Sequence, residues 1–431
     1  MPMIANRTRA AAHTRCHAPS LGLAVMLAAV LVPVAAHAEA NPWRLGGALG
    51  LQRDSNLYRL GNGREAGLPA DRSKSDTITT VSLLAGLDQP LGRHRLHADA
   101  SLRSQRYADN SMLDNQGWGF AGGFDWSAPE RLSGALKLQS HRNLARFDAD
   151  STQVQNLQKN IERIAQAEAI VRLGLVTRYS AELGYTHREV DYSASAYAAR
   201  EYRQGTVMAG LRYRPSGALG FGLGWRHART ELPRYFAGAD AADRPQRDDL
   251  DFSVQWQASG ASDLAARLSA SRTRYERITE RDWSGLTGHL SWVWRPSAKL
   301  RSTVTLLRDD GRSADFLDLG IFGGLLSDQA RTTSSLQARL AYELSAKLQL
   351  TASARRAHRV LENTVSGPLG APAISRGSDD TDHYTLGLRW QPTRGSQLGC
   401  DIARERRSAD GGLSLPLQAT TWGCQAQLML Q

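Results

Sequence analysis

The side chains of this sequence that could act on another molecule are mainly arginines, whose planar and permanently charged guanidinium suits carboxylates and phosphates. Many of them fall on the polar face of segments in which apolar and polar residues alternate, and acids such as Asp88, Glu182 and Asp251 share that face. Rings of positive side chains favour anions in a pore, whereas arginines opposite acids form ion pairs. Both interpretations stay open for the candidate contacts Arg95, Arg103, Arg172, Arg178, Arg212, Arg226, Arg267, Arg301, Arg339, Arg355 and Arg389.

No pattern of residues indicates catalysis, a metal site or a cofactor. The sequence has no P-loop, no dinucleotide-binding fingerprint, no His-Glu-x-x-His and no Gly-x-Ser-x-Gly, and its histidines lack metal-ligand spacing. Acid pairs such as Asp309-Asp310 and Asp379-Asp380 fall in or beside expected loops, where carboxylates are usually solvated. We therefore expect no enzyme, cofactor, metal or nucleic-acid partner. A membrane lipase, protease or acyl-modifying enzyme built on a barrel remains an alternative.

Length and composition narrow the class of protein. The chain has 431 residues, a formal net charge of +11 and only 3 cysteines. A mean hydropathy of −0.41 excludes a bundle of membrane helices, which needs repeated apolar runs of ~20 residues. Few cysteines exclude a disulfide scaffold, and 41% hydrophobic residues argue against a wholly disordered chain. A soluble globular protein and a membrane β-barrel both remain possible.

The first segment is expected to direct export. Arginines precede the apolar run Leu21–Val34, which is followed by Ala36-His37-Ala38, a small-x-small cleavage pattern. The run is shorter than the ~20 residues that span a bilayer, which disfavours an uncleaved anchor. We predict a signal peptide at residues 1–38 and a mature domain at residues 39–431.

Strict alternation of apolar and polar residues runs through the mature chain. From Leu219 to Trp225, for example, large apolar residues alternate with glycines. This period predicts strands with one apolar face, and runs of ~9–11 residues suit tilted strands that cross a membrane. Ile161 to Leu173 is rich in Ala and Glu and suits a helix as well. We expect an all-β, transmembrane, antiparallel up-and-down barrel of about 18 (16–18) strands. They begin near Trp43, Thr77, His94, Gly117, Leu132, Ile161, Val176, Gly205, Leu219, Leu250, Leu264, Leu286, Leu300, Ser334, Leu348, Tyr384, Leu398 and Trp422.

The connections support the same fold. Short turns alternate with long polar loops such as Arg53–Asp76, Glu231–Asp248 and Leu361–Thr381, as in outer-membrane barrels with short periplasmic turns. The repeat length overlaps that of propeller blades, but two long strands fill each repeat where a blade needs four short ones. Aromatic residues mark both expected membrane interfaces. They are Trp126, Tyr213, Trp256, Trp294, Tyr342 and Trp390 before short turns, and Trp118, Tyr185, Trp225, Tyr384 and Trp422 at the opposite ends.

Two further features lead to specific expectations. Cys400 and Cys424 lie symmetrically about Gly412, the expected tip of the last hairpin, so they should face each other and form a disulfide. The long connection near residues 310–331 carries an apolar stretch, which would either fold into the lumen as a constriction or extend the strands above the membrane. Its residues include Phe316, Leu317, Leu319, Ile321 and Phe322.

Three stretches resemble the EpsL-type outer-membrane barrels of exopolysaccharide biosynthesis and export, a group of porin-like barrels. They are the run from Arg53 to Leu60, the run from Pro90 to Arg93, and the ending from Cys424 to Gln431. The resemblance implies a conduit for a secreted polysaccharide that works with periplasmic and inner-membrane synthesis machinery. For Asp54, Asn56 and Arg59 in the first stretch, we expect a turn capped by side chains.

The sequence therefore predicts a passive channel in the outer membrane of a Gram-negative bacterium, surrounded by lipid. Its main expected cargo is an exopolysaccharide, which moves along a basic, polar lumen. The alternative is a general or solute-specific porin for small anions.

Overall fold

The computed structural model describes residues 41–128, 131–147, 157–174, 178–234, 242–277, 279, 282–310, 330–365 and 373–430. The expected signal peptide at residues 1–38 and the expected constriction residues Phe316, Leu317, Leu319, Ile321 and Phe322 lie outside the described residues. Residues 42–431 form one compact unit, which contains all of the strands.

The described part of this unit is built almost entirely of strands, with short 3-10 turns at Glu65–Gly67, Ser111–Leu113 and Ser195–Arg200. In the described part of the chain, no helix is both long enough and apolar enough to cross a membrane. The strands are β1 (Trp43–Asp54), β2 (Asp76–Leu91), β3 (His94–Tyr107), β4 (Asn115–Ser127), β5 (Leu132–Leu144), β6 (Ile161–Leu173), β7 (Tyr179–Tyr192), β8 (Tyr202–Tyr213), β9 (Leu219–Glu231), β10 (Gln246–Ser259), β11 (Ser262–Arg274), β12 (Trp283–Trp294), β13 (Leu300–Asp310), β14 (Ala330–Ser345), β15 (Leu348–Val365), β16 (Ala373–Thr393), β17 (Ser396–Asp410) and β18 (Leu417–Leu430).

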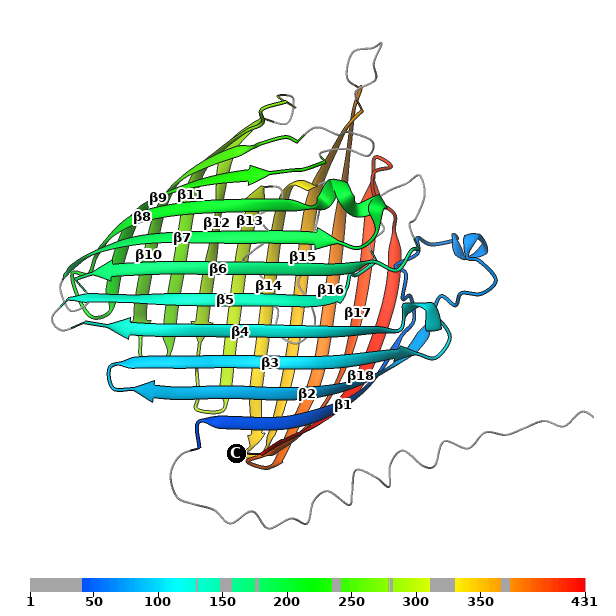
Figure 1. Cartoon of the computed structure of the whole chain (residues 1–431), viewed down its shortest axis with the longest axis horizontal. Coiled ribbons are helices and arrows are strands. Elements are labelled where there is room, and N and C mark those ends of the chain that lie inside the picture. The colour runs from blue at the N-terminus through cyan, green and yellow to red at the C-terminus, as the bar shows by residue number, and fades with distance from the viewer. Residues whose placement is uncertain are drawn as a thin grey trace, which may run out of the picture. The chain divides into compact units, whose positions relative to one another are not determined.

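The 18 strands form one closed antiparallel barrel, which confirms the predicted fold class. Each strand pairs with the next along the chain, and β1 pairs with β18 from Leu45↔Leu430 to Asp54↔Thr421 to close the cylinder. In Figure 1 the blue-to-green strands in front cross those behind at a steep angle, because strands must tilt when a sheet closes on itself. The segment Ile161–Leu173, which suited a helix equally well, is strand β6.

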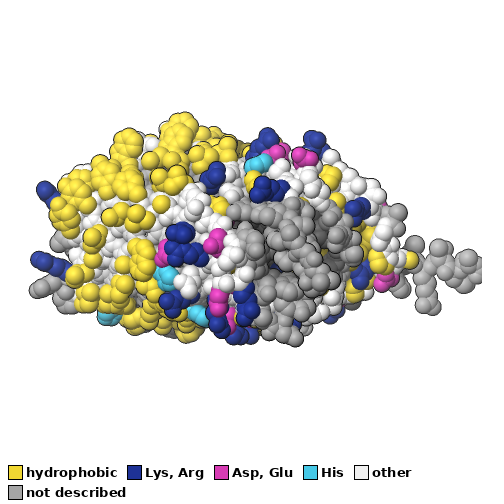
Figure 2. Space-filling view, turned by 90° about the horizontal axis from the view of Figure 1, so that it is seen from above, with side chains coloured by type: hydrophobic (Ala, Val, Ile, Leu, Met, Phe, Trp, Pro, Cys, Tyr) yellow, Lys and Arg dark blue, Asp and Glu magenta, His cyan; other side chains and the backbone are white. Residues whose placement is uncertain are grey.

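The outer wall is apolar because the large side chains of the alternating pattern all point away from the axis. Leu83, Leu211 and Leu286 are among those more than half exposed, which is unusual for leucine unless the surface meets lipid. Figure 2 shows hydrophobic side chains over a broad part of the surface on the left of the view. The interfacial aromatics Trp256, Trp294 and Trp390 are exposed at the short-turn ends of their strands.

Several strands are longer than predicted, and the extra residues lie at the ends that join the long loops. β10 begins at Gln246 rather than near Leu250, and β18 begins at Leu417 rather than near Trp422. At these ends the outward residues are polar, so the apolar alternation stops before the strand pairing does. The predicted loop Leu361–Thr381 is wrong for the same reason, because β15 and β16 stay paired out to Val365↔Ala373.

The last hairpin carries a disulfide between Cys400 of β17 and Cys424 of β18. The two residues are direct partners in the register, which turns at Gly411 and Gly412, both at positive φ. Both cysteines fall on the outward face, as Ile402 and Trp422 do. The bridge therefore joins two strands at the lipid face and leaves the lumen untouched.

The candidate site in the barrel lumen

The lumen is where the inward-facing side chains meet, and it is the candidate functional site. Alternation along each strand turns the candidate arginines of β3, β6, β8, β9 and β11 toward the axis, opposite to the leucines of the same strands. The same holds for those of β13–β16, and Arg178 lies in the turn just before β7. The structure separates these arginines into a paired group and an unpaired group.

Four of them form what we call the arginine ladder: Arg301 of β13, Arg339 of β14, Arg355 of β15 and Arg389 of β16. The strand register sets their heights. Arg389 pairs with Gln349 of β15, and Arg339 pairs with Ser353 of β15. Arg301 pairs with Ala341 of β14, which in turn pairs with Thr351 of β15. Together with Arg355, they stand level with four successive inward positions of β15. Each step rises about 7 Å, so the arginines climb about 20 Å from the short-turn end toward the loops.

The ladder arginines have no ion pair with any described residue. Arg301, Arg339 and Arg389 are exposed although they face the inside of the barrel, so their part of the lumen is accessible to water. Two carboxylates, Glu343 and Asp401, lie at the two lowest levels. Guanidinium groups that have no ion pair with a described residue and are spaced along a hydrated wall can bind a passing anion one after another.

Arg355 differs from the other three because it is buried, with 8% of its surface exposed. Its Nε and Nη1 meet no hydrogen-bond acceptor among the described residues. Its neighbours include two further cations, Arg146 and Arg359. A buried, unsatisfied cation costs folding free energy, so its presence suits a role in binding an anion.

Replacing Arg355 by methionine is expected to stabilise the barrel by about 1–3 kcal/mol, because it removes a buried polar group that lacks partners. The same variant should carry less anion current, because the ladder loses its highest member. Unfolding in detergent and single-channel recording measure the two effects. A destabilised variant would show that Arg355 has a structural partner, and an unchanged anion current would remove it from the path.

The wall opposite the ladder carries arginines that are neutralised by acids. Arg95 binds Asp88 with N–O distances of 2.6 and 2.7 Å. Glu182 lies 3.1 Å from Arg172 and 3.7 Å from Arg212. These pairs are the cross-strand interactions expected of a wet lumen, and their net charge is small.

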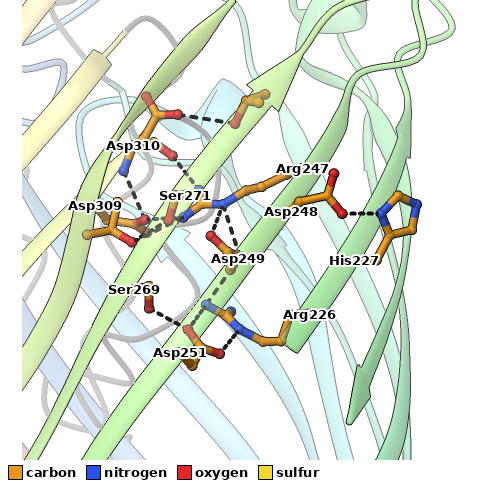
Figure 3. Close-up of polar contacts among 12 residues, drawn as sticks. Arg226, His227, Arg247, Asp248, Asp249, Asp251, Ser269, Ser271, Asp309 and Asp310 are labelled. Carbon is orange, nitrogen blue, oxygen red and sulfur yellow. Dashed lines mark hydrogen bonds and ion pairs between the residues drawn. The ribbon is translucent and has the colours of Figure 1, made fainter. Parts of the chain in front are cut away.

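A denser cluster lies on the inward face of β9–β13, near the loop ends (Figure 3). Arg226 binds Asp251 at 2.6 Å and Asp249 at 3.2 Å, and Arg247 binds Asp249 at 2.9 Å. Arg247 also reaches Asp309 of β13 at 3.5 Å. Three aspartates face two arginines here, so the cluster fixes the strands to one another and leaves no excess of positive charge.

Below this cluster the wall is hollowed into a recess of about 260 Å³, which we call the lumen recess. Gly210, Gly222 and Gly224 line it, so the wall has no side chains there. A Cβ at Gly222 would come within 2.4 Å of Ser253 Oγ. The charged and titratable groups around the recess are Arg172, Glu182, Arg212, Arg214, Arg226, Asp251, Arg267 and His289. The recess can therefore hold a small ligand beside several guanidinium groups.

The mouth of the barrel is narrowed by the first loop. Asn56 caps it as expected, since its backbone N–H donates to Asp54 Oδ1 at 2.8 Å and its side-chain oxygen accepts from Leu60 N–H at 2.8 Å. Its side-chain amide also donates to the carbonyl oxygen of Gln418 at 3.0 Å, which fastens the loop to β18. The short run after β1 therefore forms a turn capped by side chains and fixed to the neighbouring strand.

Arg59 locks this loop to the barrel wall. It lies 2.9 Å from Asp54 and 3.0 Å from Glu405 of β17, and Arg146 also binds Glu405. Burial lowers the pKa of the Arg59 guanidinium, but Glu405 and Asp54 outweigh this and raise it, so Arg59 stays charged. We call these four residues the mouth cluster.

A small hydrophobic core completes the mouth. Tyr58 is fully buried and packs against Phe147 in a tilted arrangement, with ring centroids 4.7 Å apart. Its hydroxyl donates to Asn110 Oδ1 at 2.8 Å, and burial is the main cause that raises its pKa. Leu60 and Leu113 pack against the same group. The first residues of the first loop are therefore packed into a small core at the loop end of the barrel.

Sequence reasoning missed Glu405 as the shared partner of Arg59 and Arg146. Alternation places Glu405 among the lumen acids, but nothing in the sequence links it to a residue 346 positions earlier. Among the described residues, no group of three His, Cys, Asp or Glu side chains could hold a metal ion.

Comparisons with known proteins find similar barrels among solved structures. No family profile and no curated protein matches the chain. The solved outer-membrane protein OpdK of Pseudomonas aeruginosa shares 15% identity at a TM-score of 0.46, over 90% of this chain and 99% of its own. OccK2 (OpdF) of the same organism, solved with glucuronate, shares 15% identity at a TM-score of 0.48, over 90% and 98% of the two chains. Likeness of this degree says nothing of what the present chain transports, and the exopolysaccharide-export resemblance finds no support in these comparisons.

Proposed function

We propose that this chain is a diffusion channel for small organic anions in the outer membrane of a Gram-negative bacterium. The proposal depends mainly on the arginine ladder, because it places unpaired cations at successive heights in a hydrated lumen. A closed barrel leaves no unpaired sheet edge, and its exposed leucines suit a lipid environment. The lumen recess, at about 260 Å³, is close to the size of pockets that hold small ligands.

The channel mechanism is passive. An anion enters past the mouth cluster, exchanges its water for guanidinium donors, and passes from Arg355 toward Arg339, Arg301 and Arg389, or in the reverse direction. Each contact is weak because the lower three arginines are solvated, so binding does not trap the solute. Fixed positive charge in a narrow, low-dielectric wall raises the local concentration of anions.

The polymer conduit implied by the exopolysaccharide resemblance is the second candidate, and the geometry favours it less. Arg59 and Arg146 reach from two different loops to Glu405 on the inward face of β17, and their side chains take up space at the mouth that a polymer would need. No contact with periplasmic or inner-membrane machinery is required for the anion channel.

Reversal potentials in a KCl gradient across a planar bilayer test the proposal, and chloride should permeate better than potassium. Proteoliposome swelling should be faster with glucuronate than with glucose, which has the same ring but no carboxylate. Cation preference, or equal swelling rates, would contradict the proposal. A deletion strain that loses surface polysaccharide while the purified barrel shows no anion preference would support the polymer conduit instead.

A further inference from the structure

The outer wall has a hollow that the channel function does not use. It measures about 690 Å³ and is lined mostly by outward-facing side chains of β10–β15. Its floor is apolar and includes Leu286, Leu290, Leu306 and Leu336. We call it the outer hollow.

The path of β13 accounts for the hollow. Pairing between β12 and β13 stops at Gly288↔Arg308, although β13 continues as a partner of β14 to Asp310↔Thr332. Beyond Arg308, the side chain of Asp309 and the backbone oxygen of Asp310 contact Arg247 in the lumen, at 3.5 and 3.2 Å (Figure 3). The pairing of the wall is therefore interrupted between β12 and the end of β13, beside the hollow.

Positive side chains line the edge of the hollow nearest the loops. Arg308, Ser334 and His358 are direct neighbours across β13, β14 and β15, and Arg356 lies one step lower. Arg308 is exposed and has no ion pair with any described residue. The nearby acids, Asp380 and Asp382 of β16, lie beyond β15, on the side of Arg356 away from the hollow.

Those acids hold the rim in position and do not occupy it. Asp380 is 3.2 Å from His358 Nδ1, and Asp380 and Asp382 are each 4.0 Å from Arg356. The side chain of Arg356 remains 68% exposed, so its donors are available to a ligand. The rim is therefore set to bind an anionic group directly above an apolar surface.

We propose that the outer hollow binds one lipid of the surrounding leaflet, with acyl chains on the leucine floor and a phosphate held by Arg308, Arg356 and His358. Arginine binds phosphate through paired donors, and an acyl chain gains from contact with a concave apolar wall. The combination of apolar floor and cationic rim selects an acylated, phosphorylated lipid over a neutral one. The inference depends on the proposed membrane location and is independent of the cargo.

Native mass spectrometry of the full barrel in detergent, with added lipid A as the probe, tests this inference. The double variant Arg308→Gln/Arg356→Gln should lower lipid A affinity about tenfold, because two charge-assisted contacts to phosphate are lost. Ser334→Trp keeps every charge but fills the hollow, and it should weaken binding as well. The matched control is Arg142→Gln/Arg163→Gln, which removes two exposed, outward arginines that are direct neighbours on β5 and β6, away from the hollow.

Dephosphorylated lipid A should bind the wild-type barrel about tenfold more weakly, and inorganic phosphate alone should not displace lipid A. If the control variant loses as much lipid A affinity as the double variant, lipid A is attracted to positive charge anywhere on the outer surface, and the specific site is overturned. Equal binding of dephosphorylated lipid A, or no effect of Ser334→Trp, would overturn it as well. Anion selectivity of these variants should equal that of the wild type, so failure here is distinct from failure of the channel proposal.

Discussion

Replacing Arg301, Arg339 and Arg389 together by glutamine should lower the chloride-over-potassium permeability ratio by about fivefold or more. These three ladder arginines are exposed in the lumen and have no ion pair with a described residue, so their charge acts on mobile ions. Glutamine keeps a polar side chain of similar reach, and the barrel should remain as stable as the wild type. Reversal potentials in a salt gradient measure the ratio directly.

The control for this variant removes the same charge from the outside of the barrel. Arg272, Arg404 and Arg406 are exposed on the outward face of β11 and β17, and replacing all three by glutamine changes the net charge equally. If the control shifts the reversal potential as far as the ladder variant, selectivity comes from the overall charge of the protein. If neither variant shifts it, the ladder does not line the conduction path.

The sequence was sufficient to predict the barrel because lipid and water impose opposite demands on alternate residues. From Leu219 to Trp225 the chain satisfies both demands at once, with leucines and aromatics for lipid and glycines for the lumen. The same pattern predicted the disulfide, because Cys400 and Cys424 lie in neighbouring strands joined by a short turn. Strand ends were predicted less well, since beyond the lipid the outward residues are polar and the pattern fades.

The division of the arginines into paired and unpaired groups was not predictable. The alternation of inward and outward residues placed Arg226 and Arg339 on the same, inward face. Arg226 forms ion pairs with two acids, whereas Arg339 forms none with a described residue. The difference comes from the register between strands, because the register sets the height of each side chain along the barrel. The lengths of the turns determine that register only in part. Contacts across the barrel seam are harder still, because β1 and β18 are at opposite ends of the chain.

Arg59 is the residue whose loss should disturb the lumen most. Replacing it by alanine leaves Asp54 without the arginine that binds it and removes one of the two arginines that bind Glu405, and both acids have side chains only 6% exposed. Removing one member of a buried ion pair typically costs about 3–5 kcal/mol, so the first loop should detach from the wall. We expect a lower free energy of unfolding and a higher single-channel conductance, measured by denaturant unfolding in detergent and by planar-bilayer recording.

Backbone and side-chain effects at this position can be separated, because Arg59 has a positive φ of 53°. Glycine adopts that conformation without strain, so Arg59→Gly removes the side chain while it favours the observed backbone. If the ion pairs hold the loop, the glycine variant should be destabilised nearly as much as the alanine variant. In a double-mutant cycle, Asp54→Asn should add little further loss once Arg59 is gone. Arg93→Ala, in an exposed turn at the opposite end of the barrel, should change neither stability nor conductance. A wild-type conductance in Arg59→Ala would mean that the first loop stays in place without its lock, and that the hydrophobic core around Tyr58 is what narrows the mouth.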